Sequence, residues 1–311
     1  MEQAPFSNDV AEGPDSGAAY WLRTEDDVRI RVGLWPSENA HKGTIFVFPG
    51  RTEYIEKYGR TATQLCELGY STFLIDWRGQ GLSDRATEDP MTGHVVNFSD
   101  YHKDVATMLE AAEELDLPKP WYLFGHSLGA CIALRSLKDG LPVSACAFTG
   151  PMWDISLPKH KRIAAWPLCW AAKRLNKGHL YAPGTEGVSY VTSTPFPENR
   201  LTHDLDMYQY FIHHIETLKH YQLGGPSMGW LFEILNETKK LSTLESPNTP
   251  CITFCGEEDI LIDIGAVKKR MNSWPNGTLK MIPKGKHDLM SELPEIRNSL
   301  IEQIDTLFST N

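Results

Sequence analysis

The sequence predicts an α/β protein with a mostly parallel, doubly wound sheet and an inserted helical segment. Three observations lead to this prediction. Short apolar segments alternate with amphipathic ones up to residue 150. Residues 154–241 then show helical periodicity and many aromatic side chains but no convincing strand, and strand character returns at residue 250. Alternating strands and helices are typical of a parallel sheet with helices on both faces. Right-handed crossovers would place the loops after these strands along one edge.

The composition is that of an ordinary globular protein. The chain has 311 residues, enough for one large domain with an insertion or for two modest domains, and 41% of them are hydrophobic and 23% charged. The formal net charge of −10 disfavours nucleic acid as a partner and provides no polybasic membrane anchor. No apolar run approaches the length of a transmembrane helix.

The N-terminal segment and the cysteines bear on location. Residues 1–19 are polar and acidic and lack the basic and apolar blocks of a signal peptide, so we expect a flexible leader. Most of the six cysteines lie inside apolar patterns, which predicts buried thiols in a reducing compartment. A cytoplasmic location is therefore the default expectation.

The first half of the chain contains a hairpin followed by alternating strands and helices. Two segments with alternating polarity flank Thr24-Glu25-Asp26-Asp27 and predict an antiparallel hairpin over 20–32. Continuous apolar runs then predict strands that are buried on both faces of a parallel sheet. The expected strands are 44–48, 71–75, 121–124 and 143–148, and the expected helices are 56–68, 101–115 and the segment between Ser127 and Gly140.

The middle of the chain predicts a helical cap. Helical periodicity covers 159–175, 204–221 and 228–240. We therefore assign 152–241 to a cap or lid over the edge where the loops after the parallel strands meet, and 20–151 with 242–311 to the core. Most of the aromatic residues here would pack the cap against the core, while a few would line a pocket for an apolar substrate group. The candidates for substrate contact are Trp153, Met228 and Trp230. The core resumes with strands at 250–255 and 277–282 and helices at 264–274 and 295–308.

A Gly-x-Ser-x-Gly pattern, with Ser127 between Gly125 and Gly129, joins a strand-like run to a run of helix formers. A serine at such a corner adopts a strained backbone conformation, and the glycines relieve the crowding around it. The corner also directs the unpaired N–H groups of the helix N-terminus toward whatever the serine attacks. This context predicts a nucleophile, whereas the alternative is a glycine-rich turn with an idle serine.

A serine nucleophile needs a base and a third group that orients the base. His287 follows the last predicted strand and is the only histidine after His220. Asp259 follows the strand before it, so both would lie at the same edge as Ser127. Asp154 is an alternative acid, and three other acids lie near Asp259 in the sequence: Glu257, Glu258 and Asp263.

Two backbone N–H groups are expected to stabilise the oxyanion of a tetrahedral intermediate. One is that of Leu128, directly after Ser127, and the other is that of Arg51 in the loop after the first parallel strand. Each such donor typically contributes ~3 kcal/mol to lowering the barrier. A pairing of the Arg51 and Glu53 side chains would hold that loop in place.

Several segments resemble the monoglyceride lipase and bacterial lysophospholipase branch of the α/β hydrolases, over about residues 42–308. They are Pro49-Gly50-Arg51-Thr52-Glu53-Tyr54-Ile55-Glu56-Lys57-Tyr58, Asp76-Trp77-Arg78-Gly79-Gln80-Gly81-Leu82-Ser83, Gly125-His126-Ser127-Leu128-Gly129, Gly224-Gly225-Pro226-Ser227 and His287-Asp288. The resemblance implies an α/β-hydrolase fold and hydrolysis of carboxylic esters without a cofactor, on lysophospholipids or monoacylglycerols. It also favours Asp259 as the acid. Many lipases of this branch have His-Gly where this chain has Pro49-Gly50, so the support of the oxyanion loop must differ.

Other patterns in the sequence are weaker evidence for a function. His213-His214-x-Glu216 is a weak metal pattern, because adjacent histidines on a helix diverge and no second pair exists, so we expect a polar helix face and no metal. Asp76 and Arg78 are expected to brace the turn from Gly79 to Gly81.

The predicted partner is a small lipid-like ester, and no nucleic acid partner is expected. The cap is expected to make transient contact with a membrane surface. Three alternatives to a lipid esterase remain: an esterase or aminopeptidase with the same triad, an acyltransferase, and a non-catalytic binding protein on this fold.

Overall fold

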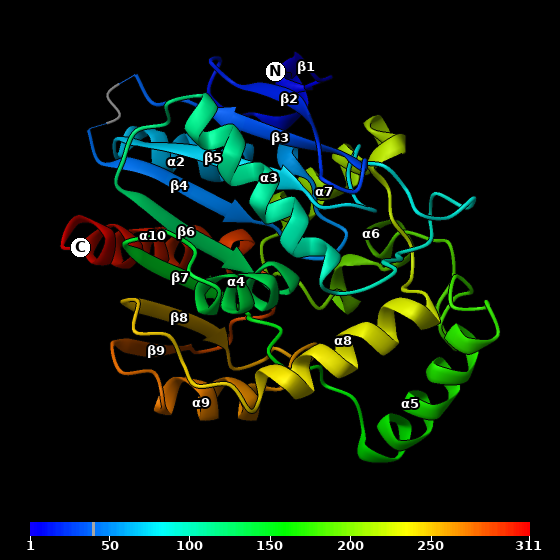
Figure 1. Ribbon diagram of the computed structural model, residues 1–311. Helices are drawn as coiled ribbons and strands as arrows, with labels where there is room; N and C mark the ends of the chain where they lie inside the picture. Colours follow the sequence, from blue (N-terminus) through cyan, green and yellow to red (C-terminus); the bar gives the residue numbers. More distant parts are fainter. Residues whose placement is uncertain (39–40) are drawn as a thin grey trace.

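The computed structural model describes residues 1–38 and 41–311. Within them, nine strands form one sheet in the order β1-β2-β3-β5-β4-β6-β7-β8-β9 (Figure 1). From β5 to β9 in this order neighbouring strands are parallel, whereas β1, β2 and β3 join antiparallel to one another and to β5. The strands are β1 Glu2–Gln3, β2 Ala18–Arg23, β3 Arg29–Trp35, β4 Gly43–Phe48, β5 Tyr70–Asp76, β6 Trp121–His126, β7 Ala145–Thr149, β8 Cys251–Gly256 and β9 Gly277–Ile282.

Helices cover both faces of the sheet. Successive side chains of a strand point to opposite faces, so Phe46 and Phe48 of β4 pack with α3, α4 and α9, whereas Ile45 and Val47 pack with α2 and α10. Figure 1 shows α3, α4 and α9 together on the near face. The core helices are α2 Gly59–Glu67, α3 Asp100–Glu114, α4 Leu128–Lys138, α9 Ile264–Asn272 and α10 Pro294–Ser309, with short 3-10 turns at Ile55–Tyr58 (η1) and Leu289–Ser291 (η4).

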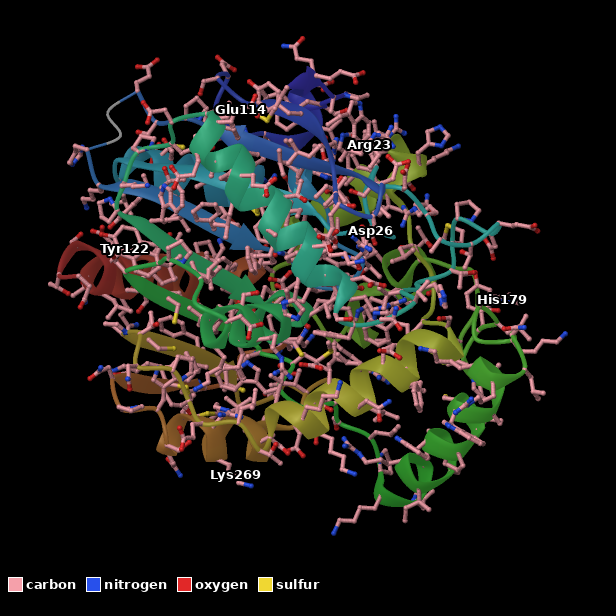
Figure 2. The ribbon with its side chains drawn as sticks, viewed as in Figure 1. Arg23, Asp26, Glu114, Tyr122, His179 and Lys269 are labelled. Carbon is pink, nitrogen blue, oxygen red and sulfur yellow. The ribbon has the colours of Figure 1, made fainter. Side chains whose placement is uncertain are left out.

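The predicted fold class is confirmed. The expected strands and helices of the core are present with ends that differ by a few residues, and the helix expected over 56–68 begins as η1. Aromatic packing joins the layers: Tyr122 of β6, which is labelled in Figure 2, stacks on Phe308 of α10 with ring centroids 4.5 Å apart. All six cysteines are free thiols, five of them buried, as their apolar surroundings predict.

Residues 1–19 pack against the core, which corrects the expectation of a flexible leader. They contain β1, which pairs with β2, and the short helix α1 Asn8–Ala11, whose Val10 and Ala11 are buried. Backbone carbonyls anchor the segment. Arg31 donates to the Pro5 carbonyl at 2.8 Å, and the Tyr210 hydroxyl donates to the Ala11 carbonyl at 2.7 Å. The sequence pattern missed this packing because it depends on backbone acceptors bound by distant side chains.

The segment 152–241 is helical, as predicted, and within it the structure has only isolated β-bridges in place of strands. α5 packs on α8 beyond the ends of the strand arrows (Figure 1). Its elements are α5 Lys159–Arg174, α6 Tyr190–Ser193, η2 Phe196–Glu198, α7 Leu205–Thr217, η3 Lys219–Tyr221 and α8 Met228–Leu241. No helix in the described part of the chain combines the length and apolar character needed to cross a membrane.

A buried ionic network joins this segment to the core. The Arg31 guanidinium lies 2.6 Å from Glu56 and 2.8 Å from Asp76, and none of these three side chains is exposed. The Tyr221 hydroxyl donates to Glu56 at 3.0 Å. Since buried charges are costly unless they are paired and hydrogen-bonded, this contact fixes η3 against the sheet. Asp76 also accepts from the Leu82 N–H at 2.9 Å and thus braces the turn that follows β5, as predicted.

Candidate active site

Ser127 occupies a strained corner between β6 and α4. Its φ of 49° and ψ of −112° lie outside the regions that non-glycine residues normally adopt. The Ser127 N–H donates to the Thr149 carbonyl at 3.1 Å, which fixes the corner to β7. A β-carbon on Gly129 would lie 1.9 Å from the Phe48 carbonyl oxygen, so only glycine lets α4 approach β4 this closely. The predicted strand-to-helix elbow is therefore present, and its close approach depends on Gly129.

The structure brings Ser127, His287 and Asp259 together in one hydrogen-bonded chain. The Ser127 Oγ lies 2.9 Å from His287 Nε2, and His287 Nδ1 lies 2.7 Å from the Asp259 carboxylate. All three residues are buried. The loops after β9 and β8 supply His287 and Asp259, as expected. Asp154 is bound elsewhere, with its carboxylate 2.6 Å from Arg162, so the structure places Asp259 and not Asp154 beside the histidine.

The Asp259 carboxylate is held in its ionised form. Burial by itself raises its pKa, but the charge and hydrogen bond of His287, followed by the Leu261 and Ile262 N–H groups, outweigh burial and hold the pKa below its usual range. An ionised Asp259 accepts a hydrogen bond from the Nδ1–H of His287, which leaves Nε2 as the acceptor for the serine proton.

The loop after β4 lies beside Ser127 and is held by groups other than those expected. The Trp77 indole donates to the Pro49 carbonyl at 2.9 Å, and Gln80 both donates to the Gly50 carbonyl and accepts from the Thr52 N–H. The expected pairing of Arg51 with Glu53 is wrong. The Glu53 carboxylate accepts from the Gly50 N–H and from Lys57, whereas the Arg51 side chain donates to the Gly224 carbonyl. Proline at position 49 is therefore compatible with a rigid loop, since its carbonyl oxygen is the atom that is bound.

Leu128 follows Ser127 directly in the chain, and Arg51 lies in the loop after β4 at the same site. Leu128 is the first residue of α4, so its N–H has no partner within the helix. Arg51 and Ser127 line the same cavity. These positions fit two N–H donors that converge on a carbonyl oxygen bound at Ser127.

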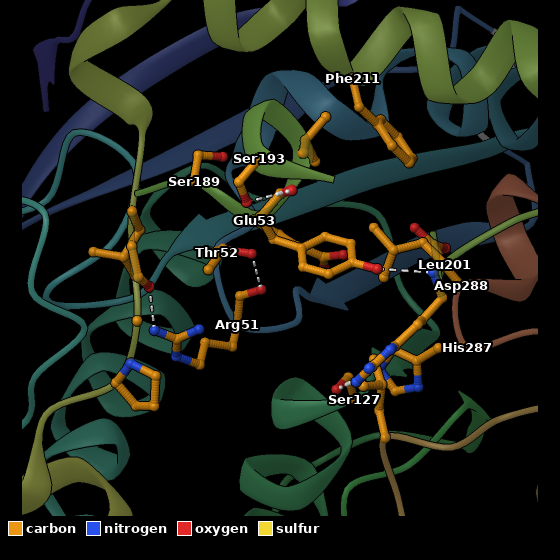
Figure 3. A pocket seen from close by; sticks show the side chains of 18 of the residues that line it. Arg51, Thr52, Glu53, Ser127, Ser189, Ser193, Leu201, Phe211, His287 and Asp288 are labelled. Carbon is orange, nitrogen blue, oxygen red and sulfur yellow. Dashed lines mark hydrogen bonds between the residues drawn. The ribbon is translucent and has the colours of Figure 1, made fainter. Parts of the chain in front are cut away.

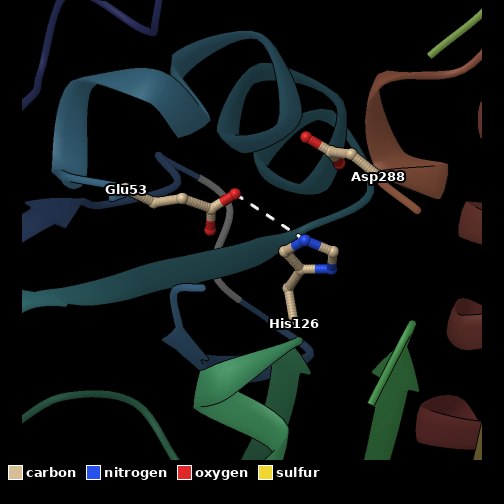
Figure 4. A group of neighbouring side chains, drawn as sticks. All are labelled: Glu53, His126 and Asp288. Atoms are coloured by element: carbon tan, nitrogen blue, oxygen red, sulfur yellow. Dashed lines mark ion pairs between the residues drawn. The ribbon is translucent and has the colours of Figure 1, made fainter. Parts of the chain in front are cut away.

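Sequence reasoning missed a buried cluster of charged groups under this loop. Glu53, His126 and Asp288 each present a ligand-type atom within 4.8 Å of the others, and all three are buried (Figure 4). The Lys57 ammonium bonds to both carboxylates, at 2.7 Å to Asp288. A sequence signal existed, because His126 precedes Ser127, Asp288 follows His287, and Glu53 and Lys57 are spaced for one helical turn. Nothing in the sequence paired them.

The charges in this cluster compensate one another. Burial raises the pKa of Asp288, but Lys57 and then His126 outweigh it and lower the pKa to about 2, and Lys57 lowers the pKa of Glu53 in the same way. Burial lowers the pKa of His126 despite its two acidic neighbours. Carboxylate and imidazole groups in this arrangement would suit a divalent cation, but the Lys57 ammonium already supplies their positive charge.

Ser127 opens into a cavity of about 620 Å³ between the core and the segment 184–226 (Figure 3). Figure 3 shows Ser127 and His287 together at one side of it and Arg51 at another. Much of the lining is apolar, including Met152, Val188, Phe211, Ile215, Leu223 and Ile262. A cavity of this size and lining is suited to an acyl chain.

Trp153, Met228 and Trp230, the residues predicted to contact substrate, do not belong to the lining of this cavity. The Trp153 indole donates to the Ala130 carbonyl at 3.1 Å and its ring stacks on Trp274, so it is a core residue. The Trp230 ring packs under the Arg51 guanidinium. Aromatic content alone did not distinguish side chains that join the cap to the core from those that face the cavity.

The prediction of a polar helix face at His213-His214-x-Glu216 is only partly right. His213 and Glu216 are exposed, but His214 is completely buried between Tyr54 and Tyr210. Burial lowers the pKa of His214 to about 3, so the ring is neutral.

Comparison with known proteins places this geometry among the serine hydrolases. The family model described as serine aminopeptidase, S33, matches residues 39–294. The chain is 31% identical to lysophospholipase L2 of Escherichia coli over 243 residues, which cover 76% of this chain and 69% of that protein. It is 25% identical to the monoglyceride lipase of Rattus norvegicus over 282 residues, which cover 88% of this chain and 85% of that one.

Solved structures match the fold. A soluble variant of the Saccharomyces cerevisiae monoglyceride lipase, bound to a substrate analogue, superposes with a TM-score of 0.72 at 18% identity, covering 94% of each chain. A thermostable carboxyl esterase from Bacillus coagulans, bound to glycerol, gives a TM-score of 0.74 at 14% identity, covering 96% of this chain and 99% of the other.

Proposed function

The chain belongs to the serine aminopeptidase S33 family of α/β hydrolases, in its lysophospholipase and monoglyceride lipase branch, and we propose that Ser127, His287 and Asp259 hydrolyse single-chain glycerolipid esters. The observation that carries the proposal is the hydrogen-bonded chain from Ser127 Oγ through His287 to Asp259. The enzyme class is that of carboxylic ester hydrolases, and the substrates are lysophospholipids or monoacylglycerols.

The mechanism follows from the order of these contacts. His287 Nε2 accepts the Ser127 proton as Oγ bonds to the ester carbonyl carbon, and the Leu128 and Arg51 N–H groups donate to the resulting oxyanion. Collapse of the tetrahedral intermediate breaks the bond to the alcohol oxygen, which takes the proton from His287. Water then enters, and its oxygen bonds to the acyl carbon as His287 accepts its proton. When this second tetrahedral intermediate collapses, the acyl–Ser127 bond breaks, Ser127 Oγ takes the proton back from His287, and the acid leaves. Asp259 stays ionised throughout and orients the imidazole.

The polar groups of the cavity favour an ester over a peptide. An aminopeptidase needs a carboxylate for the free α-ammonium of its substrate. Glu53 and Asp288 are both bonded to Lys57, and Glu186, the other acidic residue of the lining, is exposed. The apolar walls provide burial for an acyl chain instead, at about 25 cal/mol per Å² of apolar surface removed from water.

The test is a panel of monoacylglycerols, lysophospholipids, amino-acid anilides and a nitrophenyl ester, measured with the unmodified protein and Ser127→Ala. We expect ester turnover and labelling by a fluorophosphonate in the unmodified protein and neither in the variant, with the same melting temperature. Retained turnover in Ser127→Ala would contradict the mechanism. Transfer of the acyl group to an added alcohol in preference to water would identify an acyltransferase.

We also propose that 152–241 acts as a cap that contacts an anionic lipid surface through α5. Five side chains on α5 or directly after it are exposed and apolar, with Ile163 at 76% and Leu175 at 71%, beside Trp166, Leu168 and Trp170. The helix contains Lys159, Lys161, Arg162, Lys173 and Arg174 and no acidic residue, although the net charge of the chain is −10. Exposed apolar residues next to basic ones are typical of surfaces that bind anionic lipid.

Sedimentation with vesicles of phosphatidylcholine, with and without phosphatidylglycerol, tests this contact. Ile163→Asp should weaken binding to the anionic vesicles by about tenfold or more. It removes one apolar side chain that would enter the lipid surface, and it adds a negative charge. Leu293→Asp, at an exposed apolar residue just before α10, is the matched control and should change binding little. Equal binding by both variants would exclude α5 as the contact. The free thiols support a reducing compartment, and we propose the cytoplasm.

A further inference from the structure

The Arg51 side chain is a partly buried cation without a carboxylate partner at the wall of the cavity that contains Ser127. Its Nη2 donates to the Gly224 carbonyl, and its Nε is buried without a hydrogen-bond partner. Within residues 1–38 and 41–311, no carboxylate oxygen lies within 4.0 Å of its nitrogens. Arg31 and Arg78, two buried arginines of this edge, each have two acidic partners.

The guanidinium is nevertheless held in a defined slot. The Trp230 ring lies under it, with its centroid 5.4 Å from Arg51 Cζ. A β-carbon on Gly93 would lie 2.4 Å from Nη2, so the absence of a side chain at position 93 makes room for the group. Burial lowers the pKa of Arg51 to about 10, which still leaves it positively charged at neutral pH. The protein thus positions a cation with unused donors and does not neutralise it.

The position of Arg51 relates this charge to the reacting ester. Its backbone N–H is the proposed oxyanion donor, so its side chain begins next to the carbonyl and runs along the cavity wall to Gly224. In a lysophospholipid the phosphodiester is joined to the same glycerol as the ester, only a few bonds away. Two other cations line the cavity, but Lys57 is bonded to Glu53 and Asp288, and Arg200 is exposed, where solvent and salt screen its charge.

We propose that the Arg51 guanidinium binds the phosphodiester of a lysophospholipid and makes lysophospholipids the preferred substrates over monoacylglycerols. A planar guanidinium matches two phosphate oxygens, and charged hydrogen bonds of this kind are strong. A monoacylglycerol presents a neutral hydroxyl at this place and leaves the cation uncompensated. The inference rests on the proposed function and specifies which of its two substrate classes fits the site.

The experiment compares kcat/KM for an octanoyl lysophosphatidylcholine and for octanoylglycerol, both kept below their micelle concentrations, with a nitrophenyl ester as a substrate that lacks phosphate. In Arg51→Gln, the ratio of lysophospholipid to monoacylglycerol turnover should fall by about 10- to 150-fold. Arg51→Lys keeps the charge but loses the planar, two-donor geometry of the guanidinium. Its ratio should therefore lie between those of the unmodified protein and Arg51→Gln. Arg200→Gln removes an exposed cation of the same lining and should change the ratio less than Arg51→Gln does.

Each outcome decides the proposal. An equal loss on all three substrates would show that Arg51 acts on the oxyanion or on the fold, and it would overturn the inference. The inference is also overturned if the unmodified protein hydrolyses octanoylglycerol but not the lysophospholipid, although the proposed ester hydrolysis then still holds. If it hydrolyses neither, the proposed function itself fails. Should Arg51→Gln not fold, inhibition of the unmodified protein by octyl-ether glycerophosphocholine must be at least tenfold stronger than by octyl glyceryl ether.

Discussion

Replacement of Lys57 by methionine is expected to be among the most destabilising conservative changes near the site. The side chains of Lys57, Glu53 and Asp288 are only 13%, 7% and 5% exposed, and the ammonium is the cation that both carboxylates contact. Methionine keeps the volume but leaves two negative charges buried without the ammonium that neutralises them. Removal of one member of a buried ion pair typically costs about 3–5 kcal/mol of unfolding free energy.

The pH dependence of this cost gives a second readout. The pKa of Asp288 is lowered from 3.8 to about 2 in the folded protein, which by linkage corresponds to about 2 kcal/mol. Because the folded pKa is depressed, this stability is fully present above pH ~4 and is lost as the pH falls through about 2. Without Lys57 the same burial raises the pKa of both carboxylates, so the folded variant takes up protons that the unfolded chain does not. The difference between the two proteins should therefore widen as the pH rises from ~4 to ~7.

Urea denaturation across this pH range measures both effects, with ester turnover followed in parallel. Turnover should fall, because Glu53 holds the Gly50 N–H of the oxyanion loop and Asp288 adjoins His287. Lys42→Met is the matched control, since Lys42 pairs with Asp305 at 2.6 Å while about a quarter of each side chain is exposed, and it should cost at most ~1 kcal/mol. A cost below ~1 kcal/mol for Lys57→Met, with no pH dependence, would refute the reasoning.

Three further substitutions test the site and its supports. Asp259→Asn should lower kcat by about 10³- to 10⁴-fold with little change in melting temperature, because it removes the group that orients His287, whereas a comparable loss in Asp154→Asn alone would reassign the acid. Gly129→Ala places a β-carbon 1.9 Å from a carbonyl oxygen of β4 and should destabilise the fold by several kcal/mol or prevent soluble expression; a normal urea midpoint would contradict this packing. Tyr221→Phe removes a buried donor to Glu56 and should cost about 1–3 kcal/mol in urea denaturation, and an unchanged midpoint would show that the contact contributes nothing.

Much of the fold and the candidate triad could be predicted because they depend on local patterns. Apolar periodicity predicts strands and helices, and the hand of the crossovers brings every strand end to one edge. Ser127, Asp259 and His287 each follow a separate strand, so their order in the chain was enough to place them near one another. The hydrogen bonds between them then required only side-chain geometry at that edge.

The contacts that depend on distant partners could not be predicted in this way. The sequence alone predicts that a serine nucleophile, a histidine and an acid meet at the end of a parallel sheet. The tertiary structure decides that Lys57 neutralises Glu53 and Asp288, that Trp153 and Trp230 pack away from the cavity, and that residues 1–19 are anchored to the core. The physical reason is that a charge or an aromatic ring has no period in the sequence that reveals its partner. Arg51 is the clearest case, because its character as an uncompensated cation is defined only by the groups that the folded chain brings near it.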